Sequence, residues 1–126
     1  MVGIVIVSHS QKLAEGVVEI SRMMAEMAPL AAAGGLEDGS FGTSYDKICA
    51  AIEAVYSSDG VIVLMDMGSA IMTTEMVLED LDNPNVKMID CPLVEGAVLA
   101  AVDSAGGRSL EEISKRTAQI RTAKKF

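Results

Sequence analysis

Short apolar runs alternate with longer amphipathic segments along this chain. The two strongest runs lie at residues 61–65, which are all aliphatic or Met, and at residues 3–7, which are aliphatic except for Gly3. Runs that are apolar on both faces are typical of strands buried in a parallel sheet. Residues 30–33 and 86–89 form weaker runs of the same kind. The pattern therefore predicts four strands.

The segment after the first strand has apolar residues at helical spacing. Its predicted buried stripe consists of Leu13, Val17, Ile20, Met24 and Met27. These residues recur every three or four positions, which places them on one face of a helix of about five turns. Pro29 is expected to mark the end of this helix.

Further helices are expected after each later strand. They are predicted to begin after Thr43 or Ser44, to cover about 70–81 and about 93–105, and to start again at a capping box of Ser109 and Glu112. Strands that alternate with helices imply a parallel sheet with helices on both faces. The expected fold is a doubly wound α/β domain spanning residues 1–126. Its four-stranded, mainly parallel sheet has the order 2-1-3-4.

Composition and charge exclude several classes of function. Ten Lys and Arg residues against eighteen Asp and Glu residues give a net charge of −8, which disfavours binding to nucleic acid or to an anionic membrane. No apolar run is long enough to cross a bilayer, and the first residues lack a basic secretory signal. Cys49 and Cys91 form no CxxC motif, and neither GxGxxG nor GxxxxGK[ST] is present. We therefore expect a cytoplasmic protein without a metal or cofactor.

Two residues with catalytic potential follow neighbouring strands of the predicted sheet. The only histidine, His9, follows the first strand, and Asp66 follows the third. Ligands bind at the carboxyl ends of the strands in folds of this class. Asp66 could accept the Nδ1–H of His9 and leave Nε2 free for nucleophilic attack. Alternatively, Asp66 could cap the following helix.

Small residues in two loops could hold an anion beside His9. Gly68 and Ser69 open the third helix, whose first N–H groups could bind a phosphoryl group. Gly39 and Thr43, in and after a loop with four glycines, could do the same. The alternative is that these residues only form turns. From the residues alone, the prediction is a phosphate-handling or anion-binding α/β domain.

Several sequence blocks resemble a known family. Residues 3–10 with 13–16 are similar to the start of mannose-type enzyme IIA domains of the bacterial phosphotransferase system. Residues 34–39 with 42–44, residues 65–70 and residues 92–97 resemble, within that family, the phosphocarrier subunits of phosphoenolpyruvate-dependent dihydroxyacetone kinases. The resemblance covers essentially the whole chain, and the last three blocks together make it specific.

The resemblance implies a role for each candidate residue and a set of partners. His9 would carry the phosphoryl group and Asp66 would orient it. Phospho-HPr would be the donor, and the acceptor would be ADP on the subunit DhaL, whose ATP phosphorylates dihydroxyacetone on DhaK. Members of the family pair as homodimers, some by swapping a C-terminal strand, but here the C-terminal segment predicts a helix. Because the chain ends at Phe126, we expect it to use separate HPr and enzyme I.

Three alternatives come from other classes of protein. A receiver-like signalling domain would carry the phosphate on Asp66, but it needs acidic residues after the first strand, where Ser8 and Ser10 stand. A flavodoxin-like binding module could use Phe41 and Tyr45 for stacking. A metal-dependent hydrolase could use His9, Asp66 and Asp38.

Overall fold

The computed structural model describes residues 1–126 and contains one parallel sheet. Its strands are β1 (Gly3–Ser8), β2 (Leu30–Gly34), β3 (Val61–Met65) and β4 (Val86–Met88). All three strand pairs are parallel, and the order is β2-β1-β3-β4. The predicted fold class and strand order are therefore confirmed, with each strand boundary within one residue of the prediction.

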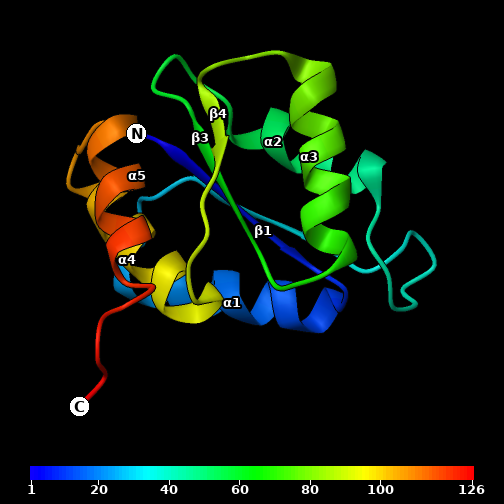
Figure 1. The fold of residues 1–126 in the computed structure, drawn as a ribbon, viewed down its shortest axis with the longest axis horizontal. Coiled ribbons are helices and arrows are strands. Elements are labelled where there is room, and N and C mark those ends of the chain that lie inside the picture. Colours follow the sequence, from blue (N-terminus) through cyan, green and yellow to red (C-terminus); the bar gives the residue numbers. More distant parts are fainter.

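Helices cover both faces of this sheet (Figure 1). They are α1 (Gln11–Met24), α2 (Tyr45–Val55), α3 (Ser69–Leu81), α4 (Leu93–Ala105) and α5 (Leu110–Gln119). The first core lies between the sheet and helices α1, α4 and α5, and the second between the sheet and α2 and α3. None of the five helices combines the length and the apolar character needed to span a bilayer.

Alternation along the central strands builds the two cores. On β1, Ile4 and Ile6 enter the first core, whereas Val5 and Val7 enter the second. All four side chains are fully buried. Successive side chains of a strand point to opposite faces, so a strand buried on both faces reads as a continuous apolar run. This packing explains why residues 3–7 and 61–65 predict strands so clearly.

The predicted buried stripe of α1 is wrong at four of its five positions. Val17 is buried, but Leu13, Ile20, Met24 and Met27 are exposed, with Met27 at 72%. The helix instead buries its smaller residues: Ala14, Val17, Val18 and Ser21. Small side chains let α1 pack closely on the sheet and on α4, which presents alanines to the same core. The helix also ends earlier than predicted. It ends at Met24 and not next to Pro29, because the C-cap Ala25 leaves the helical conformation.

Strand register brings the ends of β1 and β3 together. Val7 pairs with Met65, and the N–H of Asp66 donates to the carbonyl of Val7 at 3.1 Å. Asp66 therefore lies beside Ser8 and His9 although 57 residues separate Asp66 from His9. The sheet itself assembles the candidate site at its carboxyl edge, as the sequence predicts.

Candidate active site

The carboxylate of Asp66 accepts four hydrogen bonds at the carboxyl edge of the sheet. Its Oδ2 accepts from the hydroxyl of Ser8 at 2.8 Å and from the backbone N–H of His9 at 3.0 Å. Its Oδ1 lies 3.0 Å from Nδ1 of His9 and accepts from the N–H of Met67 at 2.7 Å. Because both oxygens are fully engaged, the carboxylate is well placed to orient a neighbour and poorly placed to become phosphorylated itself, as the receiver-like alternative requires.

These contacts keep Asp66 ionised. Burial acts to raise the pKa of Asp66, but hydrogen bonds from His9, Ser8 and Met67 outweigh burial and hold the pKa below its ordinary value. An ionised carboxylate only accepts hydrogen bonds, so Nδ1 of His9 must carry the proton in this contact. The predicted hydrogen bond between His9 and Asp66 is confirmed, and it leaves a lone pair on Nε2.

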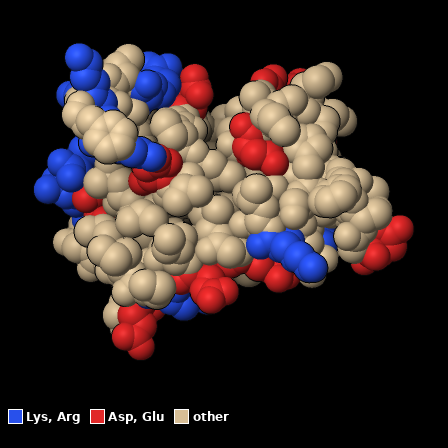
Figure 2. Space-filling model, turned by 90° about the horizontal axis from the view of Figure 1, so that it is seen from below, with Lys and Arg blue, Asp and Glu red and all other residues tan.

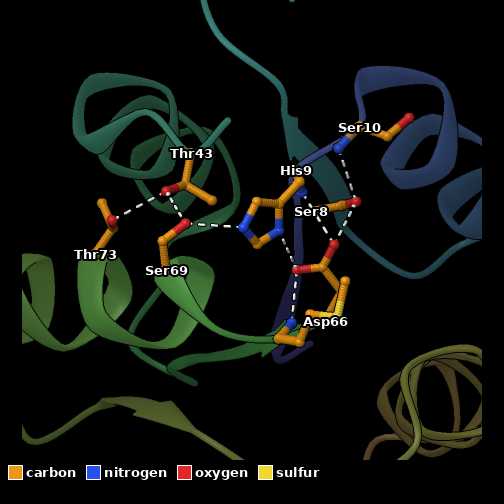
Figure 3. A network of polar contacts seen from close by, with 8 residues as sticks. Ser8, His9, Ser10, Thr43, Asp66, Ser69 and Thr73 are labelled. Carbon is orange, nitrogen blue, oxygen red and sulfur yellow. Dashed lines mark hydrogen bonds and ion pairs between the residues drawn. The ribbon is translucent and has the colours of Figure 1, made fainter. Parts of the chain in front are cut away.

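Three hydroxyl groups continue the network from Nε2 (Figure 3). The Oγ of Ser69 lies 2.8 Å from Nε2 of His9. The Oγ1 of Thr43 lies 3.2 Å from that oxygen and 3.1 Å from the Oγ1 of Thr73. The loop before α2 and the first turns of α3 thus converge on the histidine, and the predicted residues Thr43 and Ser69 join it at the site.

The start of α3 has free donors and a backbone that requires glycine. Gly68 is the N-cap, with φ of 54° and ψ of −120°, in a region that L side chains rarely adopt. No Cβ contact within 4 Å restricts this position, so conformation rather than space selects glycine. The N–H groups of Gly68 and Ser69 have no acceptor within the chain. The carboxylate of Asp66 accepts no hydrogen bond from the first turn of α3, whose N-cap is Gly68, so the alternative role of Asp66 as the N-cap is wrong.

The glycine-rich loop supports the site from the side of β2. Gly42 donates its N–H to the carbonyl of His9 at 2.9 Å, which ties the loop to the histidine backbone. Gly39 contributes a turn instead, because its N–H donates to the carbonyl of Leu36 at 2.9 Å. Asp38 bonds to Ser40 within the same turn. No group of three or more His, Cys, Asp or Glu side chains is arranged to hold a metal ion.

Neither cysteine contributes a reactive thiolate to the site. Burial raises the pKa of the Cys91 thiol to about 11, and the neighbouring Asp90 adds to the shift. Burial also raises the pKa of Cys49, on α2. A thiol with a raised pKa is a poor nucleophile at neutral pH. His9 is therefore the strongest nucleophile that the site presents.

Two residues of the network, Ser8 and Thr73, were not predicted as site residues from the sequence. Ser8 is fully buried at the end of β1, where its oxygen also accepts from the N–H of Ser10. A polar residue at the end of a wholly apolar strand is the signal that could have identified it. Thr73 lies four positions after Ser69 on α3, so the helical period places both on one face.

Fold and site together define a class of protein. A carboxylate-oriented histidine with an unprotonated Nε2 lies at the carboxyl edge of a doubly wound sheet, and this arrangement suits transfer of a group through the imidazole. The model of the EIIA-man family, described as the PTS system fructose IIA component, matches residues 3–114. The chain belongs to this family.

Within this family, the chain is similar to subunits of dihydroxyacetone kinases. The phosphoryl donor subunit DhaM of the PEP-dependent dihydroxyacetone kinase of Escherichia coli (strain K12) is 41% identical over an alignment of 120 residues, and the match covers 90% of this chain and 25% of that protein. The chain thus spans about a quarter of that relative. The phosphotransferase subunit DhaM of the PTS-dependent dihydroxyacetone kinase of Lactococcus lactis subsp. lactis (strain IL1403) is 39% identical over 90% of this chain and 91% of its own length.

A solved structure has the same fold over the full chain. The crystal structure of EF1359, a protein of unknown function, superposes with a TM-score of 0.85 at 26% identity. The match covers 100% of this chain and 99% of that one.

Proposed function

We propose that this protein is a phosphohistidine carrier that accepts a phosphoryl group from phospho-HPr on Nε2 of His9. It passes the group to ADP bound on DhaL, and the resulting ATP drives phosphorylation of dihydroxyacetone on DhaK. The observation that carries the proposal is the contact of Asp66 with Nδ1 of His9, because it keeps the ring proton on Nδ1 and leaves Nε2 unprotonated as the nucleophile. The similarity to proteins named as DhaM supports the choice of substrate and partners.

The chemical step needs only the imidazole and its carboxylate. The Nε2 lone pair attacks phosphorus, and the bond from phosphorus to the nitrogen of the donor phosphohistidine breaks. The proton on Nδ1 stays in place, so Asp66 faces the positive charge that the ring gains. Transfer to ADP reverses the role of Nε2: its bond to phosphorus breaks as the β-phosphate oxygen of ADP attacks. Positioning and charge stabilisation supply most of the catalysis in such reactions.

Neutral donors are proposed to hold the phosphoryl group. The hydroxyls of Ser69 and Thr43 lie on the Nε2 side of the ring, and the free N–H groups of Gly68 and Ser69 open α3 nearby. No Lys or Arg contacts this network, which suits a group that must leave again readily. We keep the prediction that the backbone at Gly39 approaches the phosphoryl group closely, so that a side chain at this position would impair transfer.

We further propose a cytoplasmic homodimer. The unpaired state of Cys49 and Cys91 suits a reducing compartment. The broad exposed apolar surface of α1, which includes Met23 at 79% and Met24 at 62%, is available for contact with a second copy. Sedimentation equilibrium that gives the monomer mass at micromolar concentration would exclude the dimer.

A labelling experiment tests the function directly. We expect incubation with phosphoenolpyruvate, enzyme I and HPr to place one acid-labile phosphate on His9, located by mass spectrometry. His9→Ala should abolish labelling with the fold unchanged. Asp66→Asn should slow transfer by about 10²–10⁴-fold, because an amide cannot accept from all four donors. Labelling that persists in His9→Ala, or phosphate on Asp66 that hydroxylamine removes, would overturn the proposal.

A further inference from the structure

We propose that Thr73 is a positioning residue for phosphoryl transfer, as the first donor in a one-way chain of hydroxyl groups that ends on Nε2 of His9. The chain runs from Thr73 to Thr43 over 3.1 Å, to Ser69 over 3.2 Å and to Nε2 over 2.8 Å. The transfer step in this inference rests on the proposed function. The hydrogen-bond chain does not, because it belongs to the unphosphorylated protein.

The direction of the chain follows from the carboxylate at its far end. Asp66 only accepts, so the single ring proton of neutral His9 lies on Nδ1 and Nε2 must accept. Ser69 has one hydroxyl proton and gives it to Nε2, so its oxygen can only accept from Thr43. Thr43 has then used its own proton, and it must accept from Thr73. Every hydroxyl orientation in the chain is thus determined, whereas isolated hydroxyls rotate freely.

The position of Thr73 allows its hydroxyl to hold the side chain of Thr43 in place. Thr73 and Ser69 are one turn apart on α3, and Thr43 comes from the loop before α2 to lie between their oxygens (Figure 3). Thr73 is partly buried, whereas Ser69 is exposed. The hydroxyl of Thr73 therefore anchors a loop residue against the more rigid helix. Without it, Thr43 keeps a single side-chain contact and can turn away from the histidine.

Phosphorylation frees the donors of this chain. Once phosphorus occupies the Nε2 lone pair, the Ser69 proton loses its acceptor and becomes available to a phosphoryl oxygen. The proton of Thr43 can turn in the same direction, while Thr73 continues to hold the Thr43 oxygen. The chain thus presents two neutral donors on the side where the phosphoryl group arrives. Loss of Thr73 should therefore affect both the resting imidazole and the transfer rate.

A set of three variants tests this role. Thr73→Val keeps the shape and removes the hydroxyl, and Thr73→Ser restores it. Thr74→Val is the matched control, because the neighbouring Thr74 hydroxyl is fully buried and has no hydrogen-bond partner. The first readout is the ¹⁵N resonance of the imidazole in unphosphorylated protein, which is unambiguous because His9 is the only histidine. The second readout is single-turnover transfer from phospho-HPr.

Thr73→Val should move the Nε2 resonance towards that of an unbonded neutral imidazole and leave Nδ1 in place. It should slow transfer by about 3- to 10-fold, the effect expected for one hydrogen bond. Thr73→Ser and Thr74→Val should match the wild type in both readouts. An unchanged Nε2 resonance or an unchanged rate in Thr73→Val overturns the proposal. If instead the wild-type protein takes no phosphate on His9, the proposed function fails, and the resonance still decides whether the chain exists.

Discussion

At the residue scale, the fourfold contact of Asp66 determines how His9 presents its imidazole. Two of the four donors come from the histidine itself, through its backbone N–H and its ring. Ser8 is the one side-chain hydroxyl among them, and it is fully buried. The hydroxyl oxygen of Ser8 also accepts a hydrogen bond from the backbone N–H of Ser10, and Ser10 is the N-cap of α1. Ser8 thus links the end of β1, the start of α1 and the orienting carboxylate.

Removal of the Ser8 hydroxyl should raise the pKa of Asp66. A carboxyl group whose pKa is lower in the folded than in the unfolded protein stabilises the fold above its ordinary pKa. This stabilisation is lost as pH falls towards the folded value. The hydrogen bond from Ser8 is one of the contacts that lower the pKa of Asp66. In Ser8→Ala, the pKa should move up towards its ordinary value, so that the orientation of His9 is lost at a higher pH than in the wild type.

Titration of the Asp66 carboxyl carbon by NMR measures this shift. Ser10→Ala is the matched control, because it removes a helix-capping hydroxyl but keeps the backbone N–H that bonds to Ser8. It should weaken α1 and leave the pKa of Asp66 unchanged. An equal pKa of Asp66 in Ser8→Ala and in the wild type would show that the hydroxyl only fills space.

At the scale of the elements, local patterns predicted the type and order of every helix and strand. The apolar runs at β1 and β3 and the capping box of Ser109 and Glu112 are local signals, and the structure confirms each of them. The buried face of α1 is not a local property. It depends on how closely the helix approaches its neighbours, and here alanines and valines face the core while the larger side chains face outwards.

Local sequence patterns also predicted only part of the site. Position along the strands predicted His9 and Asp66, and neighbouring strands made their contact a reasonable expectation. The tie between Thr43 and Thr73 joins a loop to the second turn of a helix, and its existence depends on how α2 and α3 pack. Sequence spacing pointed to no such contact. The single N–H of Gly39 likewise bonds within its own turn, a detail that composition does not reveal.

Close packing of α1 against β2 makes Gly34 a sensitive position. A Cβ at Gly34 would lie 2.5 Å from the carbonyl oxygen of Ser10 and 2.8 Å from the Cα of Gln11, so backbone would have to move. We expect Gly34→Ala to destabilise the protein by about 1–3 kcal/mol, as for other overpacked sites. The measurement is urea unfolding followed by circular dichroism.

Gly16, on the helix that packs against Gly34, provides the matched control. A Cβ at Gly16 would meet nothing within 4 Å, and the residue is exposed in the interior of α1. Gly16→Ala should therefore stabilise the protein by about 0.5–1 kcal/mol through helix propensity. A Gly34→Ala protein as stable as the wild type would show that α1 can shift away from β2 without cost.

At the scale of the whole molecule, charge is unevenly distributed along the chain. Up to residue 107 there are four basic and sixteen acidic residues, whereas from residue 108 onwards there are six basic and two acidic ones. Figure 2 shows one face of the molecule, with basic groups gathered mainly at one side, acidic groups around the edges and a largely uncharged middle. The loops around His9, residues 8–10, 34–44 and 66–69, contain no Lys or Arg and therefore offer apolar contacts rather than a cationic clamp. Phe41 and Met67, exposed at 81% and 66%, are the large apolar side chains of these loops.

Donor and acceptor should compete for this surface. Both must bring a reacting atom in line with Nε2 of His9, so the two partners must use overlapping footprints in turn. Excess ADP-loaded acceptor subunit should therefore slow phosphorylation of this protein by phospho-HPr.

Exposed aromatic and Met side chains suit brief contacts of this kind, and Phe41→Ala should weaken binding of both partners by about 5-fold or more. Leu81→Ala is the matched control, because Leu81 is also an exposed apolar residue but lies at the end of α3 away from His9. Isothermal titration against each partner measures both effects, and simultaneous binding of HPr and the acceptor, or a loss confined to one of them, would show that the footprints are separate.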